Sequence, residues 1–415
     1  MKQLSASWYL KTRTALAQSL SPDSILILAG NGELERTRDV SYPFRQSNNF
    51  LYLTGISQPD AVLVIRKSQD GSVSEQLYIK KLHPFMAAWE GRSNQLEELK
   101  NISILNDIIE YTKLDELIGN LLTKSPQIVY LDMPDEVTAQ IAAWQLWQQI
   151  KDLKPDLELA AINQAIGALR VVKSPEEVYL VTLAIAETEK TLHHVRPLLV
   201  TGVTELEIAA EFVRYSAVSG YEQAWPPIVS FGRNSCVIHH TPNRTKLKTG
   251  DLVLFDVGLE VGGYSSDISR MVQIGKMSDR QEQVLQAVRD VQSDAIELMK
   301  PGIRFDEFER QAAEIMVRKL IELELFKDEA EANKLEGDLQ WPAYRRYFNH
   351  MTSHYLGLDA HDVGARDAVF ESGMVLTCEP GIYIEKERIG VRIEDDILIT
   401  VDGNKNLSEG VVLDS

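Results

Sequence analysis

Short apolar runs alternate with turn signals through the first part of the chain. The runs SILILAG, FLYLTGISQPDAVLVIRK and EQLYIKK fall within residues 24–81, and QIVYLDMP is followed by a helical pattern over 135–151. Strand-length apolar runs that alternate with a helical period are typical of an α/β layout. We therefore expect an α/β domain in the amino-terminal part of the chain.

A helix start is predicted at residues 174–177. Ser174 is a favoured N-cap residue, Pro175 suits the first helical position, and Glu177 stands three residues after the cap, so a capping box is expected. Single hydrophobic cores stop growing at about 250–300 residues, and this chain has 415. Two domains are therefore predicted, an amino-terminal domain of residues 1–169 and a second domain of residues 170–415.

The second part contains a weak internal repeat. TGVTELEIAAEFVRY from Thr201 and PGIRFDEFERQAAEI from Pro301 each follow a long helical segment and carry a glycine ahead of an acidic helix start. Each is followed by histidines and then by two acids on either side of a turn. This order predicts a duplicated helix–helix–hairpin unit, which is an α+β domain.

Asp256 and Asp267 flank a Gly-Gly pair in the segment DVGLEVGGYSSD. Folding this segment about Val261 and Gly262 places the two aspartates directly across from each other on paired strands. Like charges in that position repel each other. The run DLVLFDVG is almost entirely apolar, so Asp256 belongs on a buried strand, where an unpaired carboxylate is costly. Something positively charged is therefore expected between the two acids.

The segment EPGIYIEKERIGVRIE repeats this arrangement. Its midpoint falls at Lys386 and Glu387, so Glu379 is expected across from Glu394. Arg392 can neutralise one of the two acid pairs, but no lysine or arginine is spaced to neutralise both. Divalent cations accept several carboxylate oxygens, and four acids suit two ions about 3.5–4 Å apart. Because the donors are mainly hard oxygens, Mn²⁺ is favoured, with Zn²⁺, Co²⁺ and Fe²⁺ as alternatives.

Five of the eight histidines lie just ahead of the two acid hairpins. They fall in VIHHTPN and HMTSHYLGLDAH, at His239, His240, His350, His354 and His361. Imidazole is both a metal ligand and a proton-transfer group near neutral pH. These histidines are therefore expected to be ligands and catalytic groups, whereas a single loop histidine usually lies on the polar surface.

Composition narrows the class of protein. The formal charge is −18, from 61 acidic and 43 basic residues, with no lysine or arginine cluster, which argues against nucleic acid as a partner. No leader-like start and no apolar run of about 18 residues occurs, so neither secretion nor a membrane partner is expected. Cys236 and Cys378 cannot form a disulfide framework and are expected to be small buried residues of a cytoplasmic protein.

These sequence blocks resemble those of a known family. HHTPN, DLVLFDVG, GYSSDISR, HMTSHYLGLDAHDVG, LTCEPGIYI and GVRIEDD resemble blocks of the pita-bread metallopeptidases, specifically the Xaa-Pro aminopeptidases (aminopeptidase P). YPFRQSNNFLYLTGISQPDAVLVI and AAWEGR resemble the accessory domain of that family, which methionine aminopeptidases lack. HMTSH and TCEPG depart from the family pattern, which commonly has glycine after the first histidine and valine before the glutamate.

The resemblance implies a site and a reaction. It places the family's metal ligands on Asp256, Asp267, His354, Glu379 and Glu394. A hydroxide that bridges two divalent ions would attack the peptide bond that precedes a proline at the second position of the substrate. Catalytic roles fall to Glu379 as proton carrier, His239 and His361 as stabilisers of the tetrahedral intermediate, His350 as a substrate contact and Arg392 as a group that orients the ligands.

Three functions stay open at the level of the sequence. The first is an Xaa-Pro aminopeptidase, with Tyr264, Tyr355 or Trp89 as candidates to line an apolar recess for proline. The second is an Xaa-Pro dipeptidase (prolidase), and the third is a non-catalytic pita-bread module that binds peptides or proteins. Creatinase-like hydrolysis without metals is disfavoured because no ligand is missing. Trp89 resembles a tryptophan that reaches a neighbouring subunit's site in family oligomers, so a homo-oligomer, a dimer or a tetramer, is expected.

Overall fold

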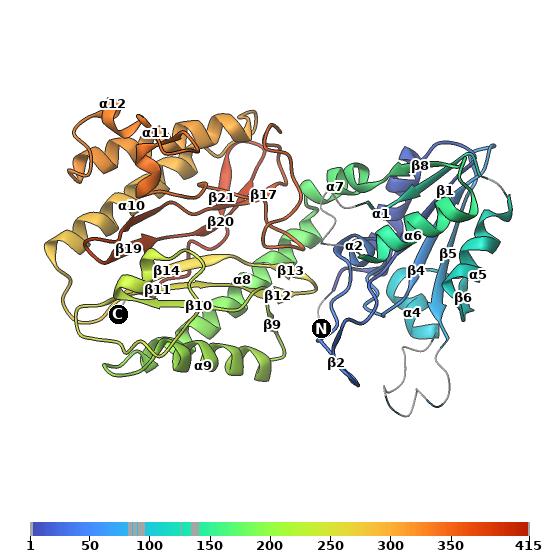
Figure 1. Ribbon diagram of the computed structural model, residues 1–415, viewed down its shortest axis with the longest axis horizontal. Coiled ribbons are helices and arrows are strands. Elements are labelled where there is room, and N and C mark those ends of the chain that lie inside the picture. Colours follow the sequence, from blue (N-terminus) through green and yellow to red (C-terminus); the bar gives the residue numbers. More distant parts are fainter. Residues whose placement is uncertain are drawn as a thin grey trace. The chain divides into compact units, whose positions relative to one another are not determined.

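The computed structural model describes residues 3–81, 85, 89, 96–124, 126–133 and 141–413. The chain forms two compact units, Gln3–Arg170 and Val171–Ser415, and each is described by itself (Figure 1). Within the segment AAWEGR only Trp89 belongs to the described residues, and positions 135–140 of the expected helix also lie outside them.

The amino-terminal unit is built on one mixed sheet with the strand order β6-β5-β4-β1-β7-β8. The pairs β1–β4 and β4–β5 are antiparallel, while β5–β6, β1–β7 and β7–β8 are parallel. Its strands are β1 (Ser24–Ala29), β2 (Glu35–Thr37), β3 (Val40–Ser41), β4 (Val62–Lys67), β5 (Val73–Lys80), β6 (Ile108–Tyr111), β7 (Ile128–Leu131) and β8 (Glu158–Ala161). Its helices are α1 (Ala6–Ser19), α2 (Asn48–Thr54), α4 (Leu96–Ser103), α5 (Leu114–Leu121), η1 (Leu122–Lys124), α6 (Ile141–Leu153) and α7 (Asn163–Val171). The predicted α/β layout is confirmed.

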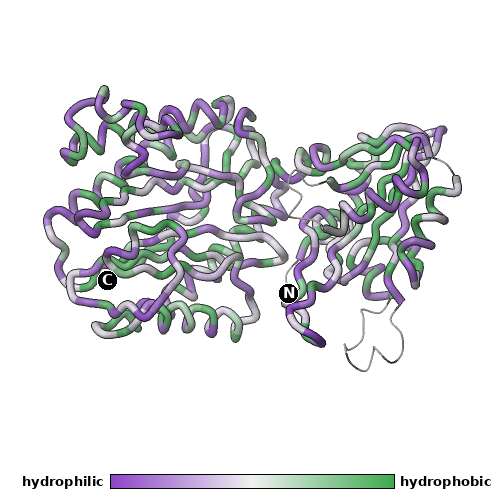
Figure 2. The backbone as a smooth tube through the Cα atoms, in the orientation of Figure 1, coloured by the Kyte–Doolittle hydropathy of each residue, from purple (hydrophilic) through white to green (hydrophobic). Residues whose placement is uncertain are grey.

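The core of this unit lies between the sheet and the helices α5 and α6. Ile25 and Ile27 of β1 pack there with Val64 of β4, Ile118 of α5 and Ile150 of α6. Figure 2 shows the same alternation in the backbone trace, where hydrophobic stretches follow the strands and hydrophilic ones follow the outer loops.

The first half of the carboxy-terminal unit is a helix pair followed by strands. Its elements are α8 (Pro175–Val195), η2 (Arg196–Leu198), α9 (Glu205–Val218), β9 (Glu222–Gln223), β10 (Ile228–Phe231), η3 (Gly232–Cys236), β11 (Leu252–Val257), β12 (Leu259–Val261), β13 (Tyr264–Ser265) and β14 (Ile268–Gln273). The predicted capping box opens α8, since the peptide N–H of Ser174 donates to the carboxylate of Glu177 at 2.7 Å, and the N–H of Glu177 donates back to the Ser174 hydroxyl at 3.4 Å. The sheet order here is β10-β11-β14.

The second half repeats the order of helix, helix and hairpin. Its elements are α10 (Asp279–Leu298), α11 (Phe305–Glu322), α12 (Glu329–Ala332), β15 (Leu335–Glu336), β16 (Trp341–Pro342), η4 (Ala343–Arg346), β17 (Val375–Cys378), β18 (Gly381–Ile384), β19 (Ile389–Arg392), β20 (Asp395–Ile399) and β21 (Asn404–Asn406). In Figure 1 the strands of both halves lie between the pair α8 and α9 and the pair α10 and α11. The predicted duplicated architecture is confirmed.

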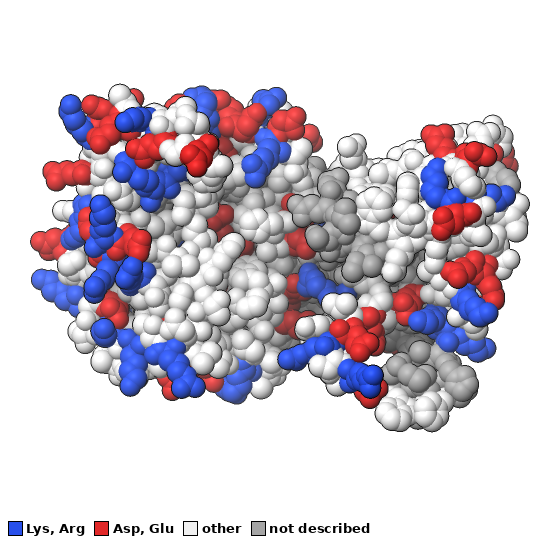
Figure 3. Space-filling view, in the orientation of Figure 1, with Lys and Arg blue, Asp and Glu red and all other residues white. Residues whose placement is uncertain are grey.

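Apolar helix faces hold the strands of the second half in place. Val288 of α10 and Met316 of α11 pack against Ile382 and Val391 of the β18–β19 hairpin. The outer helix faces carry ion pairs such as Arg310–Glu307 at 2.6 Å. Figure 3 shows basic and acidic side chains interspersed along the margins of the visible face. Among the described residues, none of the helices has the length and apolar character that crossing a bilayer requires.

Candidate metal centre

The two halves of the carboxy-terminal unit meet at Ser269 and Glu394. The peptide N–H of Glu394 donates to the carbonyl oxygen of Ser269 at 3.2 Å, and the Ser269 hydroxyl donates to the Glu394 carboxylate at 2.7 Å. The buried Arg392 donates its Nε to the same hydroxyl at 2.9 Å. This bridge between β14 and the start of β20 brings the acids of both hairpins into one place.

The first hairpin differs from its predicted register. Asp256 pairs with Ser269, so Asp267 is not directly opposite Asp256, and that prediction is wrong by two positions. Gly262 and Gly263 have φ values of 61° and 86°, as a two-residue turn of type I′ requires. The turn is therefore centred on Gly262 and Gly263, one residue later than the predicted Val261 and Gly262, and this moves every cross-strand partner by two residues.

The second hairpin has the predicted register. Gly381 pairs with Arg392, and the same register continues into the pairing of β17 with β20. Extending the Gly381–Arg392 pair by two residues sets Glu379 opposite Glu394. The Glu394 carboxylate accepts from Ser269 of the first half, and the Glu379 carboxylate lies 3.5 Å from His354.

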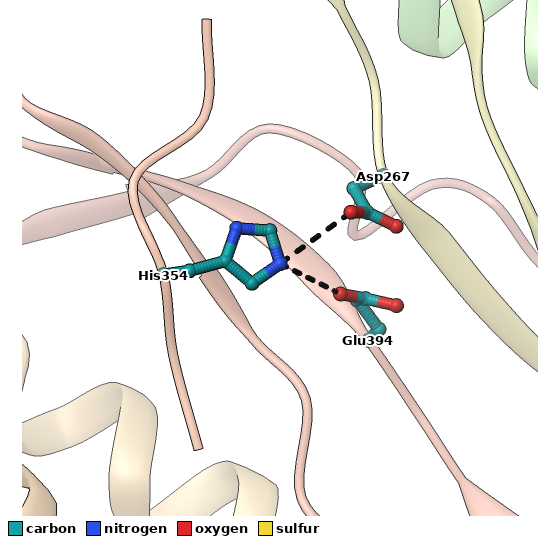
Figure 4. Close-up of side chains that lie close together, drawn as sticks. All are labelled: Asp267, His354 and Glu394. Carbon is teal, nitrogen blue, oxygen red and sulfur yellow. Dashed lines mark ion pairs between the residues drawn. The ribbon is translucent and has the colours of Figure 1, made fainter. Parts of the chain in front are cut away.

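His354 stands at the centre of a carboxylate cluster (Figure 4). Atoms of Asp267, His354 and Glu394 that can bind metal lie within 4.8 Å of one another. The His354 Nε2 is 3.5 Å from Asp267, 3.9 Å from Glu394 and 3.5 Å from Glu379. Its Nδ1 donates to the carbonyl oxygen of Tyr355 at 3.1 Å, so Nε2 is the nitrogen with a free lone pair for a metal.

The charges of this cluster fit a bound cation. Burial, and next the neighbouring Glu394 carboxylate, raise the pKa values of Asp267 and Glu379 well above their usual range. Burial raises the pKa of Asp256 to about 6, although the Arg392 guanidinium opposes that rise. Burial also lowers the pKa of His354 to about 4, which keeps the imidazole neutral near pH 7. Crowded carboxylates beside a neutral imidazole are a donor set for divalent ions.

Arg392 connects the cluster to His350 through Tyr383. Arg392 forms an ion pair with Asp256 and donates Nη1 to the Tyr383 hydroxyl at 3.1 Å. That hydroxyl lies 2.8 Å from the Nε2 of His350, whose Nδ1 is 2.8 Å from the carbonyl oxygen of Met351. Tyr383 was missed from the sequence. Its only signal there is its place on the strand between Glu379 and Arg392.

The cluster opens into a cavity of about 680 Å³. Its lining includes every predicted ligand and catalytic residue, namely His239, Asp256, Asp267, His350, His354, His361, Glu379, Arg392 and Glu394. The rings of His354 and His361 stack with centroids 4.0 Å apart. An apolar part of the lining is formed by Trp225, Pro226, Ile228, Ile238, Phe305 and Tyr355.

The three aromatic candidates for a proline recess have different positions. Tyr355 lines the cavity and stacks on Phe305 with ring centroids 5.5 Å apart. Tyr264 is not in the lining described for this cavity, and its hydroxyl donates to Glu177 at 2.8 Å. Trp89 belongs to the amino-terminal unit and is 71% exposed.

A buried carboxylate–histidine centre between two duplicated halves is a donor set for divalent metal ions, and comparison with known families places this centre in a metallopeptidase family. Residues 179–401, more than half of the chain, match metallopeptidase family M24. The chain belongs to this family. Residues 9–130 match the aminopeptidase P N-terminal domain.

Within this family, the chain is similar over almost its full length to individual Xaa-Pro aminopeptidases. The chain is 32% identical to the Xaa-Pro aminopeptidase of Haemophilus influenzae and 30% identical to that of Escherichia coli, in both cases over 99% of this chain and 96% of the relative. A solved structure of zinc-substituted E. coli aminopeptidase P in complex with product superimposes with a TM-score of 0.84 at 29% identity, covering 99% of this chain and 96% of that one.

Proposed function

We propose that the protein is an Xaa-Pro aminopeptidase, which hydrolyses the bond between the first residue of a peptide and a following proline. The observation that carries this proposal is the convergence of Asp267, His354, Glu379 and Glu394 in one cavity with the Asp256–Arg392 pair. The similarity over 99% of the chain to two Xaa-Pro aminopeptidases supports the substrate class. Residues 1–169 form the accessory domain and residues 170–415 the catalytic domain in this proposal.

Five residues would hold the metal: Asp256, Asp267, His354, Glu379 and Glu394. Divalent ions held by these residues would activate a water molecule as the nucleophile and would act as a Lewis acid on the scissile carbonyl. Manganese is the proposed metal because four of the five donors are carboxylates.

Glu379 is the proton carrier in the proposed reaction. Its carboxylate lies 3.6 Å from His350 and 3.5 Å from His354. The Glu379 carboxylate lines the cavity, so one of its Oε atoms would take the proton of the attacking water and deliver it to the proline nitrogen. That nitrogen must gain a proton to leave, since a proline amide has no N–H of its own.

Histidines bind and stabilise the substrate. His239 and His361 line the cavity and would donate N–H groups to the oxygen of the tetrahedral intermediate. His350, held by Tyr383, would contact the substrate peptide, and Arg392 orients both Asp256 and Tyr383. The apolar wall with Phe305 and Tyr355 offers a recess for the proline ring.

The proposal includes a homo-oligomer, either a dimer or a tetramer. It also includes a cytoplasmic location. The exposed Trp89 is the expected contact to a neighbouring subunit. Both cysteines are free thiols, which suits a reducing compartment.

The test is a panel of peptides with and without a chelator. We expect the manganese-loaded protein to cleave a tripeptide and a pentapeptide with proline at the second position, and to leave matched peptides with alanine there intact. Cleavage of Gly-Pro alone would show a dipeptidase instead. Failure to bind manganese or to cleave any peptide would show a non-catalytic binding module.

A further inference from the structure

One wall of the substrate cavity has no regular secondary structure of its own. Residues 238–242 follow η3, precede β11 and all line the cavity, His239 among them. A segment without helix or strand hydrogen bonds needs other contacts to keep a fixed shape. In this protein those contacts come from the first turn of α9.

Glu205 supplies four of them with one side chain. Its Oε1 accepts the peptide N–H of Phe231 at 2.8 Å and the Nδ2 of Asn234 at 2.8 Å. Its Oε2 accepts the Nε2 of His240 at 2.8 Å and the peptide N–H of Asn243 at 3.1 Å. The carboxylate is fully buried. It thus holds the end of β10, the helix η3, the middle of the cavity wall at His240 and the residue that follows the wall, Asn243.

We propose that Glu205 is a positioning residue for the aminopeptidase reaction, acting through residues 238–243 to keep His239 in place. Four donors leave no free lone-pair direction on either oxygen, so the carboxylate fixes the segment in one arrangement. The Glu205–His240 bond also defines which ring nitrogen of His240 carries the proton. The inference rests on the proposed function, since it assigns His239 a part in the reaction.

Glu207 provides a matched control in the same helical turn. Its carboxylate accepts the peptide N–H of Thr204 at 2.8 Å and caps the helix, but it is exposed and does not line the cavity. Glu207→Gln keeps side-chain size and removes one charge, as Glu205→Gln does. A difference between the two variants therefore reports on the contacts of Glu205 and not on the charge of the helix.

In Glu205→Gln the new amide group faces two N–H donors, so two of the four hydrogen bonds are lost. We expect kcat on an Xaa-Pro peptide to fall about 10- to 100-fold, as for other small displacements of reacting groups. KM should stay within about threefold, because a group that acts mainly in the transition state changes kcat. Manganese content should be unchanged, and Glu207→Gln should keep the wild-type kcat.

Hydrogen exchange followed by mass spectrometry gives a readout independent of activity. Peptides covering 231–243 should exchange faster in Glu205→Gln, while peptides covering β11 should not change. If Glu205→Gln fails to fold, Asn234→Ala replaces it, because this variant removes one donor to Glu205 from outside the cavity; its kcat should fall about threefold or more.

Two results would overturn the inference. Unchanged exchange over 231–243 would show that Glu205 does not hold the segment, and faster exchange with a wild-type kcat would show that the reaction does not need it held. A wild-type protein that cleaves no Xaa-Pro peptide, yet shows the expected exchange difference, would refute the proposed function while keeping the structural part of the inference.

Discussion

The two acid hairpins of the carboxy-terminal unit reach the same site by different turns. The first turns at Gly262 and Gly263, so Asp256 lies opposite Ser269 and not opposite Asp267. The second turns through Arg388, a non-glycine residue with φ 61°, and sets its two glutamates opposite each other. The two hairpins therefore differ in which residues their acids face across the strands. They share the place to which the acids are brought, which is the same site.

The histidine segments of the two halves show a second parallel. In the first half Glu205 of α9 holds the wall that carries His239. In the second half Glu309 of α11 accepts the peptide N–H of Thr352, between His350 and His354, with its two oxygens at 3.1 and 3.0 Å. A carboxylate on the second helix of each half thus supports the histidines of that half.

The surroundings of these two carboxylates, Glu205 and Glu309, differ. Glu205 has side-chain and peptide donors on both oxygens. Burial raises the pKa of Glu309 to about 7, and backbone hydrogen bonds from Thr352 and Ser353 only partly oppose the rise. The second half therefore contains a supporting acid that titrates near neutral pH.

The largest expected effect comes from the second hairpin. Glu379→Gln keeps the shape of the side chain but removes the carboxylate that we propose as a metal ligand and proton carrier. We expect kcat/KM on an Xaa-Pro peptide to fall about 10³-fold or more, from the loss of general acid–base catalysis together with weaker metal binding. Steady-state kinetics at saturating manganese measures this.

Glu385→Gln on the same hairpin is the matched control. Glu385 is exposed and pairs with Arg233 at 2.5 Å, away from the cavity. Its loss should change kcat/KM by less than about twofold, as surface ion pairs contribute little. Equal effects of the two substitutions would contradict the role given to Glu379.

Much of this site could be predicted because its chemistry follows chain order. The acids lie beside apolar strand runs, the histidines lie just ahead of them, and all nine predicted site residues line one cavity. The start of α8 at Ser174 was readable for a similar reason, since a capping box is complete within four residues.

The supporting residues could not be predicted, because tertiary contacts alone distinguish them. Glu205 and Glu207 look alike in the sequence as acids in the first turn of α9, but only Glu205 is buried and bonded to His240, 35 positions away. Glu309 meets Thr352 across 43 positions. The predicted register of the first hairpin is wrong for a local reason, because the turn is centred on Gly262 and Gly263 and not on Val261 and Gly262.

Metal removal tests whether both hairpins depend on the same ions. Manganese at about 1,000 times its Kd would stabilise the native state by about 4 kcal/mol, which corresponds to a rise in Tm of about 10 °C for a domain of this size. Calorimetric scans with manganese and with chelator would measure the shift. An unchanged Tm would contradict a shared metal site in the native protein.

Asp267→Asn makes this test more specific, because the substitution should change Tm in opposite directions, relative to the wild type, without and with manganese. Burial and the Glu394 charge raise the pKa of Asp267, so without metal the neutral asparagine relieves repulsion and should raise Tm above that of the wild type. With manganese the variant lacks one of the five proposed ligands and should gain only about half of the wild-type shift in Tm. A variant that is less stable under both conditions would show that Asp267 has a purely structural role.

Glu309 makes the stability of the second half depend on pH. Its pKa is about 7 in the native state, against an ordinary value of 4.5, so the native state holds the proton more tightly than the unfolded state. The stabilisation is complete below about pH 4.5 and is lost as pH rises to about 7, by as much as about 3 kcal/mol. Urea unfolding of wild type and Glu309→Gln from about pH 5 to 8 would measure it.

As pH rises, the wild type should lose unfolding free energy relative to Glu309→Gln, because only the wild type carries the titrating carboxyl group. Glu314→Gln, an exposed position on the same helix that pairs with Arg310, is the control and should give a difference independent of pH. A pH-independent difference for Glu309→Gln as well would contradict the raised pKa.

The smallest effect concerns the two turns. An L-residue in the left-handed region costs about 1 kcal/mol relative to glycine, so Gly262→Ala should lower Tm by about 2–4 °C, and Arg388→Gly should raise it by a similar amount or less. Arg388 is exposed, so its replacement removes little packing. Differential scanning calorimetry resolves shifts of this size. Shifts of the same sign would show that side-chain contacts, and not backbone conformation, dominate at one of these turns.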